Sequence, residues 1–98
     1  MKIAFDVDGT LIHDGNPEFK VGVTPLCDTP RYDVIGLFRT FQSLGCDMFI
    51  WSGGGVEYAE MWRNKLGLDA KVVEKGSFIP DLSVDDLRVE LGKVNLKV

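Results

Sequence analysis

The chain has 98 residues, 45% of them hydrophobic, and a formal net charge of −4 at pH 7. This length predicts one domain spanning residues 1–98, and the hydrophobic share excludes a disordered tail. The acidic balance does not indicate a nucleic-acid partner, although a local basic patch would be compatible with one. Cys27 and Cys46 lack the spacing of a zinc site or a disulfide framework, so we expect inert thiols.

The chain shows no sign of membrane insertion or export. No apolar run approaches the length that spans a bilayer, and the run near the N-terminus is too short for a signal peptide. We therefore expect a soluble cytoplasmic protein without a membrane partner.

The first predicted element is a strand at residues 3–5, whose lack of polar side chains is typical of burial on both faces. Asp6, Asp8, Gly9 and Thr10 follow it directly. Two carboxylates are thus expected at the carboxyl end of a strand, where open α/β sheets bind ligands. A hairpin with an Asp-Gly turn fits these residues as well. A calcium-binding loop does not, because its glycine and its final glutamate are missing.

Residues 11–29 are rich in turn-forming residues. Phe19, Val21 and Val23 alternate with polar or small residues, which predicts one arm of a small hairpin. The single histidine, His13, is interpreted as an ordinary surface residue.

A helix is predicted to begin at Thr29-Pro30, with threonine as its cap, and to end at Gly45 in a left-handed conformation. A second buried strand follows at residues 48–51 and ends at Ser52, before three glycines. The serine hydroxyl and the free N–H groups of a glycine-rich turn suit an oxyanion such as phosphate. A flexible connector fits the same residues.

The next helix is predicted at residues 56–66, with Gly67 ending it, and a short strand at residues 72–73 precedes Lys75. There is no room for a crossover helix between Lys75 and the strand that follows. A parallel connection usually takes a dozen residues or more, so the strand at 72–73 is expected to be a stub or absent from the sheet.

The last predicted buried strand ends at Asp85-Asp86. These carboxylates either belong to a site at the carboxyl edge or cap a helix predicted at residues 87–91 and closed by Gly92. The alternating residues 94–98 predict a half-exposed edge strand.

The ordered set of these motifs resembles the haloacid dehalogenase-like (HAD) superfamily of phosphohydrolases. The family's motifs are Asp-x-Asp-Gly-Thr, as at residues 6–10; an apolar strand ending in serine or threonine, as at Ser52; a lysine; and an apolar strand ending in acids, as at Asp85-Asp86. A two-component receiver domain places its acidic pair first and its lysine last, so it does not fit. The resemblance implies an α/β fold: a three-layer Rossmann-like core with a mostly parallel sheet, a small hairpin flap over the active site and no cap domain.

The resemblance also implies a Mg²⁺-dependent phosphatase that forms an aspartyl-phosphate. Asp6 would be the nucleophile and Asp8 the general acid–base. Of the two candidate lysines, Lys75 is preferred over Lys71, because it follows the short strand and so lies at the edge where the carboxylates gather.

The implied residues fall into three overlapping sets. The catalytic residues would be Asp6, Asp8, Ser52 and Lys75. The phosphate-binding residues would be Gly9, Thr10, Ser52, Gly53 and Lys75. The metal ligands would be Asp6, Asp8 through its main-chain carbonyl, Asp85 and Asp86.

The implied partner is a phosphorylated substrate, and its class stays open between small sugar or nucleotide phosphates, nucleic-acid termini and phosphoproteins. A homo-oligomer also stays open. The alternative function is a catalytically silent binding or interaction domain with the same fold.

Overall fold

The computed structural model describes residues 1–13, 20–21, 24–25 and 29–98. The helices and strands of this part of the chain are, in order, β1 (Lys2–Phe5), β2 (Lys20–Val21), β3 (Thr24–Pro25), α1 (Tyr32–Ser43), β4 (Asp47–Ile50), α2 (Val56–Leu66), β5 (Lys71–Val72), β6 (Leu82–Asp85) and β7 (Val94–Lys97).

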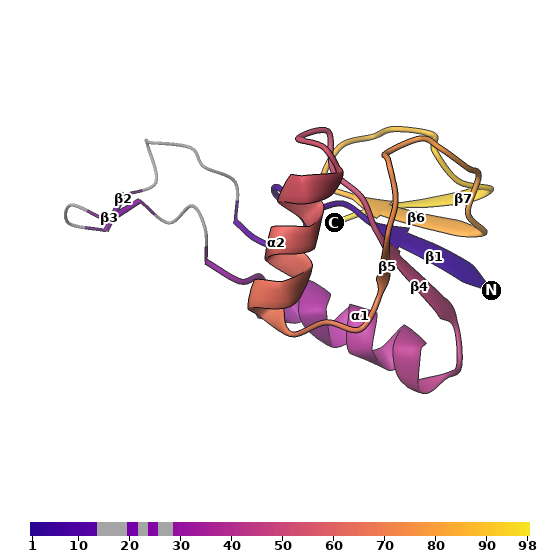
Figure 1. Cartoon of the computed structure of the whole chain (residues 1–98), viewed down its shortest axis with the longest axis horizontal. Coiled ribbons are helices and arrows are strands. Elements are labelled where there is room, and N and C mark those ends of the chain that lie inside the picture. The colour runs from indigo at the N-terminus through magenta and orange to yellow at the C-terminus, as the bar shows by residue number, and fades with distance from the viewer. Residues whose placement is uncertain (14–19, 22–23, 26–28) are drawn as a thin grey trace.

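Five of the strands form one sheet in the order β5-β4-β1-β6-β7, and every pairing in it is parallel (Figure 1). The parallel sheet expected from the sequence is therefore confirmed. β1 lies in the middle, with β4 on one side and β6 on the other. Because the strands are parallel, their carboxyl ends meet at one edge, which is where the polar side chains of the three motifs are brought together.

Both helices cover the same face of the sheet (Figure 1). Alternate residues of β1, Ile3 and Phe5, point into this layer and are fully buried with Phe38 of α1 and Trp62 of α2. The rings of Phe5 and Phe38 meet edge to face with centroids 5.2 Å apart. Such contacts between apolar and aromatic side chains supply the main stabilisation of a small sheet.

The opposite face carries Ala4, Phe49 and Trp51, and no helix of the described chain covers it. Phe78 packs here instead, with its ring centroid 4.7 Å from that of Phe49 and 5.6 Å from that of Trp51. The expectation of three layers is therefore wrong, although the α/β class is right. The reason lies in the chain length: residues 73–81 alone carry the chain from β5 across the sheet to β6, which leaves no room for a helix.

The first helix begins later than predicted. α1 starts at Tyr32 with the extended residue Arg31 as its N-cap, and no side chain caps it. Pro30 instead forms an antiparallel bridge with Ile12, which holds the preceding residues out of the helix. The predicted end is confirmed, since Gly45 is left-handed with φ 83°.

The second helix and the short strand match their predictions closely. α2 spans Val56–Leu66 and ends at Gly67, which is left-handed with φ 67°. β5 is a two-residue strand that pairs in parallel with β4 at the edge of the sheet, so the predicted stub is present.

The helix predicted at residues 87–91 is absent. In the structure these residues are neither helical nor part of a sheet. They connect two parallel strands, so the chain must return along the length of β6, about 13 Å for four residues. Five helical residues would advance only about 7.5 Å. The final strand β7 is parallel to β6, and all four of its residues are exposed rather than half-exposed.

The predicted hairpin is present as β2 and β3, which pair antiparallel through Lys20–Pro25 and Val21–Thr24 and extend beyond the carboxyl edge of the main sheet (Figure 1). Phe19 and Val23, on which the prediction also depended, lie outside the described residues, as does Cys27. Neither helix of the described chain is long and apolar enough to cross a membrane.

Candidate functional site

Asp6 lies at the centre of the carboxyl edge, because it directly follows the central strand. Its N–H donates to the carbonyl of Val84 on β6 at 3.0 Å, and the carbonyl of the preceding Phe5 accepts from the N–H of Trp51 at 3.1 Å. The backbone of Asp6 is therefore fixed from both sides, and the residue is only 6% exposed. A carboxylate this buried requires compensating partners.

The turn after Asp6 closes tightly over one carbonyl. The N–H groups of Thr10, Leu11 and Ile12 lie 3.1, 3.0 and 3.2 Å from the oxygen of Val7. This turn brings the buried Thr10 hydroxyl back to 3.4 Å from the Asp6 carboxylate. The hydroxyl also lies 3.5 Å from Asp86, so it spans two of the acids.

Gly9 occupies a position in this turn that disfavours any side chain. Its φ is +77°, and a Cβ added there would overlap the carboxylate of Asp86. Arg31 donates from Nη1 to the Gly9 carbonyl at 2.7 Å, which ties the turn to the start of α1. The Asp-Gly pair therefore serves the close approach of an acid from β6 rather than a hairpin between adjacent strands.

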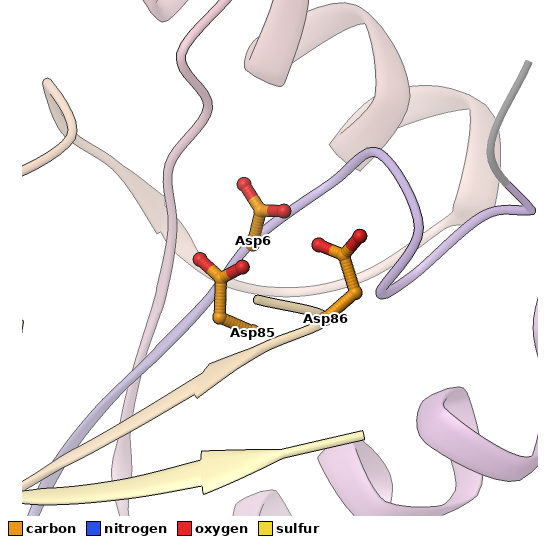
Figure 2. Close-up of side chains that lie close together, drawn as sticks. All are labelled: Asp6, Asp85 and Asp86. Atoms are coloured by element: carbon orange, nitrogen blue, oxygen red, sulfur yellow. The ribbon is translucent and has the colours of Figure 1, made fainter. Parts of the chain in front are cut away.

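Three carboxylates converge at this edge. Asp6 comes from the end of β1, and Asp85 and Asp86 come from the end of β6 (Figure 2). One carboxylate oxygen from each lies within 4.8 Å of the others. The parallel pairing of β1 with β6 causes this meeting, since it places both carboxyl ends side by side.

Lys75 joins two of these acids. Its Nζ donates to Asp6 Oδ1 at 3.0 Å and to Asp85 Oδ2 at 2.9 Å. The other candidate, Lys71, has its Nζ 5.8 Å from the ring centroid of Phe49, at the amino end of the short strand β5. The structure thus brings Lys75 to the carboxylates.

The electrostatics of the cluster reflect excess negative charge. The pKa of Asp6 is raised from its ordinary 3.8 to about 6: burial is the largest cause, the charges of Asp85 and Asp86 add to it, and Lys75 opposes them. Burial also raises the pKa of Asp86, together with a hydrogen bond to Asp85. Burial alone would lower the pKa of Lys75, but its hydrogen bonds to Asp85 and Asp6 outweigh burial and raise it.

The donor set fits a hard divalent cation. Asp6, Asp85 and Asp86 offer carboxylate oxygens close together, the ligand type that Mg²⁺ prefers. Lys75 supplies one positive charge against these three carboxylates. The neighbouring acids add to burial in raising the pKa values of Asp6 and Asp86, and a bound cation would offset this mutual repulsion.

Asp8 stands apart from the carboxylate cluster. It is exposed, and its Oδ1 accepts a hydrogen bond from the hydroxyl of Tyr58 at 2.6 Å. Tyr58 lies in the first turn of α2, fifty positions along the chain from Asp8. No sequence pattern singled out Tyr58 or Arg31, because both reach the turn through tertiary contacts alone.

Ser52 and Gly53 lie at the same edge, immediately after β4. Ser52 is 5% exposed, and its Oγ accepts the N–H of Gly54 at 3.0 Å. The N–H of Gly55 closes the turn by donating to the Ser52 carbonyl at 3.1 Å. In the described part of the chain the structure records no hydrogen bond between Ser52 and the carboxylates. Gly53 is exposed, and a Cβ there would meet no atom within 4 Å.

The contacts of Asp85 decide between the two interpretations of the acidic pair, a site at the carboxyl edge or the cap of a helix. Its Oδ1 accepts the N–H of Leu87 at 3.0 Å, as a capping aspartate would, but no helix follows. Its other oxygen is engaged by Lys75. The acid therefore stabilises a turn with one oxygen and faces the cluster with the other.

Comparison with known proteins identifies no relative of this chain: no family model, no curated protein and no solved structure matches it.

Proposed function

We propose that this chain is a Mg²⁺-dependent phosphomonoester hydrolase of the HAD type, with Asp6 as the nucleophile. The observation that carries the proposal is the bridge of Lys75 between Asp6 and Asp85, inside a cluster of three carboxylates at the carboxyl edge of a parallel sheet. A structural ion pair has no need of a third, partly buried acid with a raised pKa.

The first step transfers the phosphoryl group to the enzyme. A carboxylate oxygen of Asp6 attacks phosphorus, the bond to the leaving oxygen breaks, and the leaving oxygen takes a proton from the Asp8 carboxyl. Asp8 suits this role because its side chain lies outside the carboxylate cluster, two residues beyond the nucleophile. The alcohol then departs and leaves an aspartyl-phosphate on Asp6.

The second step releases phosphate. The Asp8 carboxylate takes a proton from water as the water oxygen attacks phosphorus, and the bond between phosphorus and Asp6 breaks. Both carboxyl groups thereby return to their starting protonation states. Splitting the reaction in this way lowers the barrier of an exceptionally slow hydrolysis, for which an enzyme supplies on the order of 20 kcal/mol.

The remaining residues offset charge. Lys75 faces the attacking carboxylate from 3.0 Å and would neutralise a phosphoryl oxygen placed there. Ser52 and the N–H of Gly53 offer hydrogen-bond donors at the same edge. Asp6, Asp85, Asp86 and the Asp8 carbonyl would hold Mg²⁺, which supplies charge compensation between the acids and a dianionic substrate.

The test is phosphate release from nitrophenyl phosphate and from a panel of sugar, nucleotide, nucleic-acid and peptide phosphates, with Mg²⁺ and with a chelator. We expect the wild type to release phosphate only with the metal, and Asp6→Asn to be inactive while still folded. Asp47→Asn is the matched control, because Asp47 is exposed at the opposite end of β4.

Two results would contradict the proposal. Asp6→Asn retaining half of the wild-type rate would end the assignment of the nucleophile. A folded wild type that binds phosphorylated ligands and hydrolyses none of the panel would favour a silent binding domain.

A further inference from the structure

We propose that Tyr58 is a positioning residue that sets the orientation of the Asp8 carboxyl group for proton transfer. The inference deepens the proposed phosphatase function and rests on it. It assigns the orientation of Asp8 to a residue in the first turn of α2, which lies outside both the motif at residues 6–10 and the turn that begins at Ser52.

The contact itself is short and specific. The Tyr58 hydroxyl donates to Asp8 Oδ1 at 2.6 Å, within the range of a hydrogen bond from a hydroxyl to a carboxylate. Asp8 is exposed, so without this bond its side chain would sample several rotamers in water. A reacting group held in one orientation contributes more to the rate than one that must find it at each turnover.

The glycine-rich turn makes room for this contact. A Cβ added to Gly54 would lie 3.0 and 3.2 Å from ring atoms of Tyr58, tighter than ordinary van der Waals contact. A Cβ at Gly54 would therefore require the ring that carries the hydroxyl to shift by a few tenths of an ångström. The same residue donates its N–H to Ser52 Oγ, so one glycine serves both the serine turn and the tyrosine.

The bond also distinguishes the two oxygens of Asp8. Because Oδ1 accepts from Tyr58, Oδ2 is the oxygen left to carry the transferable proton. In the first step Oδ2 gives its proton to the leaving oxygen as the bond from that oxygen to phosphorus breaks. In the second step Oδ2 takes a proton from the attacking water. Tyr58 keeps its own proton throughout, so it remains a positioning residue.

The experiment compares wild type with Tyr58→Phe on two substrates, nitrophenyl phosphate and phenyl phosphate, with Mg²⁺ present. Phenolate is the poorer leaving group and depends more on protonation. We expect Tyr58→Phe to lower kcat/KM for phenyl phosphate about tenfold or more and for nitrophenyl phosphate less than about threefold. Tyr32→Phe is the control, because Tyr32 is 76% exposed on α1, and it should match wild type.

A double mutant separates positioning from a general structural effect. In an Asp8→Asn background, Tyr58→Phe should change the rate no further, because the group it orients is gone. Equal losses on both substrates, an unchanged rate, or a full further loss in the Asp8→Asn background would each overturn the inference. None of these outcomes depends on whether Asp6→Asn abolishes activity, which tests the proposed function by itself.

Discussion

The burial of Asp6 predicts that this side chain destabilises the fold at neutral pH. Its pKa of about 6 lies above its ordinary value of 3.8, so between these values the native state binds a proton that the unfolded chain has released. Stability contributed by the protonated group is therefore lost as the pH rises through this window. Each pH unit between the two pKa values corresponds to about 1.36 kcal/mol. The full cost of ionising Asp6 in the folded protein is therefore about 3 kcal/mol.

Asp6→Asn should remove this cost with little other change. The amide keeps the size of the side chain and an oxygen that can accept from Lys75, which also retains its bond to Asp85. The advantage of the variant over wild type in the free energy of unfolding should grow by about 2 kcal/mol as the pH rises from roughly 4 to 7.5, which is the larger part of the full cost of about 3 kcal/mol. For a chain of this length the change corresponds to a shift of roughly 8–16 °C in Tm.

The measurement is denaturant unfolding of both proteins across this pH range in the presence of a chelator, so that no divalent cation compensates the cluster. The difference between the two proteins is the informative quantity, because all other titrating groups contribute to both curves. Asp47→Asn, at an exposed position at the opposite end of β4, is the control variant. Parallel curves for wild type and Asp6→Asn would refute the reasoning.

Three other outcomes follow from the site. Lys75→Ala should lower kcat by about 10²–10³, because a group that faces the nucleophile is lost, whereas Lys71→Ala should stay near wild type in the same phosphate-release assay. Asp85→Ala should weaken Mg²⁺ binding in calorimetric titrations more than Asp86→Ala, because only Asp85 matches the direct metal ligand that the resemblance implies, and the reverse order would make Asp86 the direct ligand. Gly9→Ala should destabilise the fold by at least about 1–2 kcal/mol in denaturant unfolding, because φ is positive there and Asp86 must also move; no loss of stability would contradict the observed close approach.

The position of Tyr58 shows where prediction from the sequence stopped. In the sequence it is one residue of an amphipathic helix, with no motif around it. It becomes part of the site only because α2 packs on the sheet beside the turn that carries Asp8. Contacts between residues fifty positions apart depend on how a helix is placed and rotated, and a local pattern contains neither quantity.

The two wrong predictions about helices have a related cause. A capping aspartate and a closing glycine are consistent with a helix at residues 87–91, and the local signals favoured one. The chain must instead return along the full length of β6 before it enters β7, so an extended path is required. Likewise, Thr29 can cap a helix, but the bridge between Pro30 and Ile12 delays the start of α1 to Tyr32.

The sequence by itself determined most of the strands, the helix α2 and the position of Asp6, Asp85 and Asp86 at strand ends, and the resemblance added the expectation of a mostly parallel sheet. These follow from local causes: uncharged runs form buried strands, and the polar residues that end them must lie at strand ends. The tertiary structure alone decided that Lys75 joins Asp6 to Asp85, that Phe78 covers the face left without a helix, and that the pKa of Asp6 is raised. Each of these depends on distance and burial, which arise only when separate strands are packed side by side.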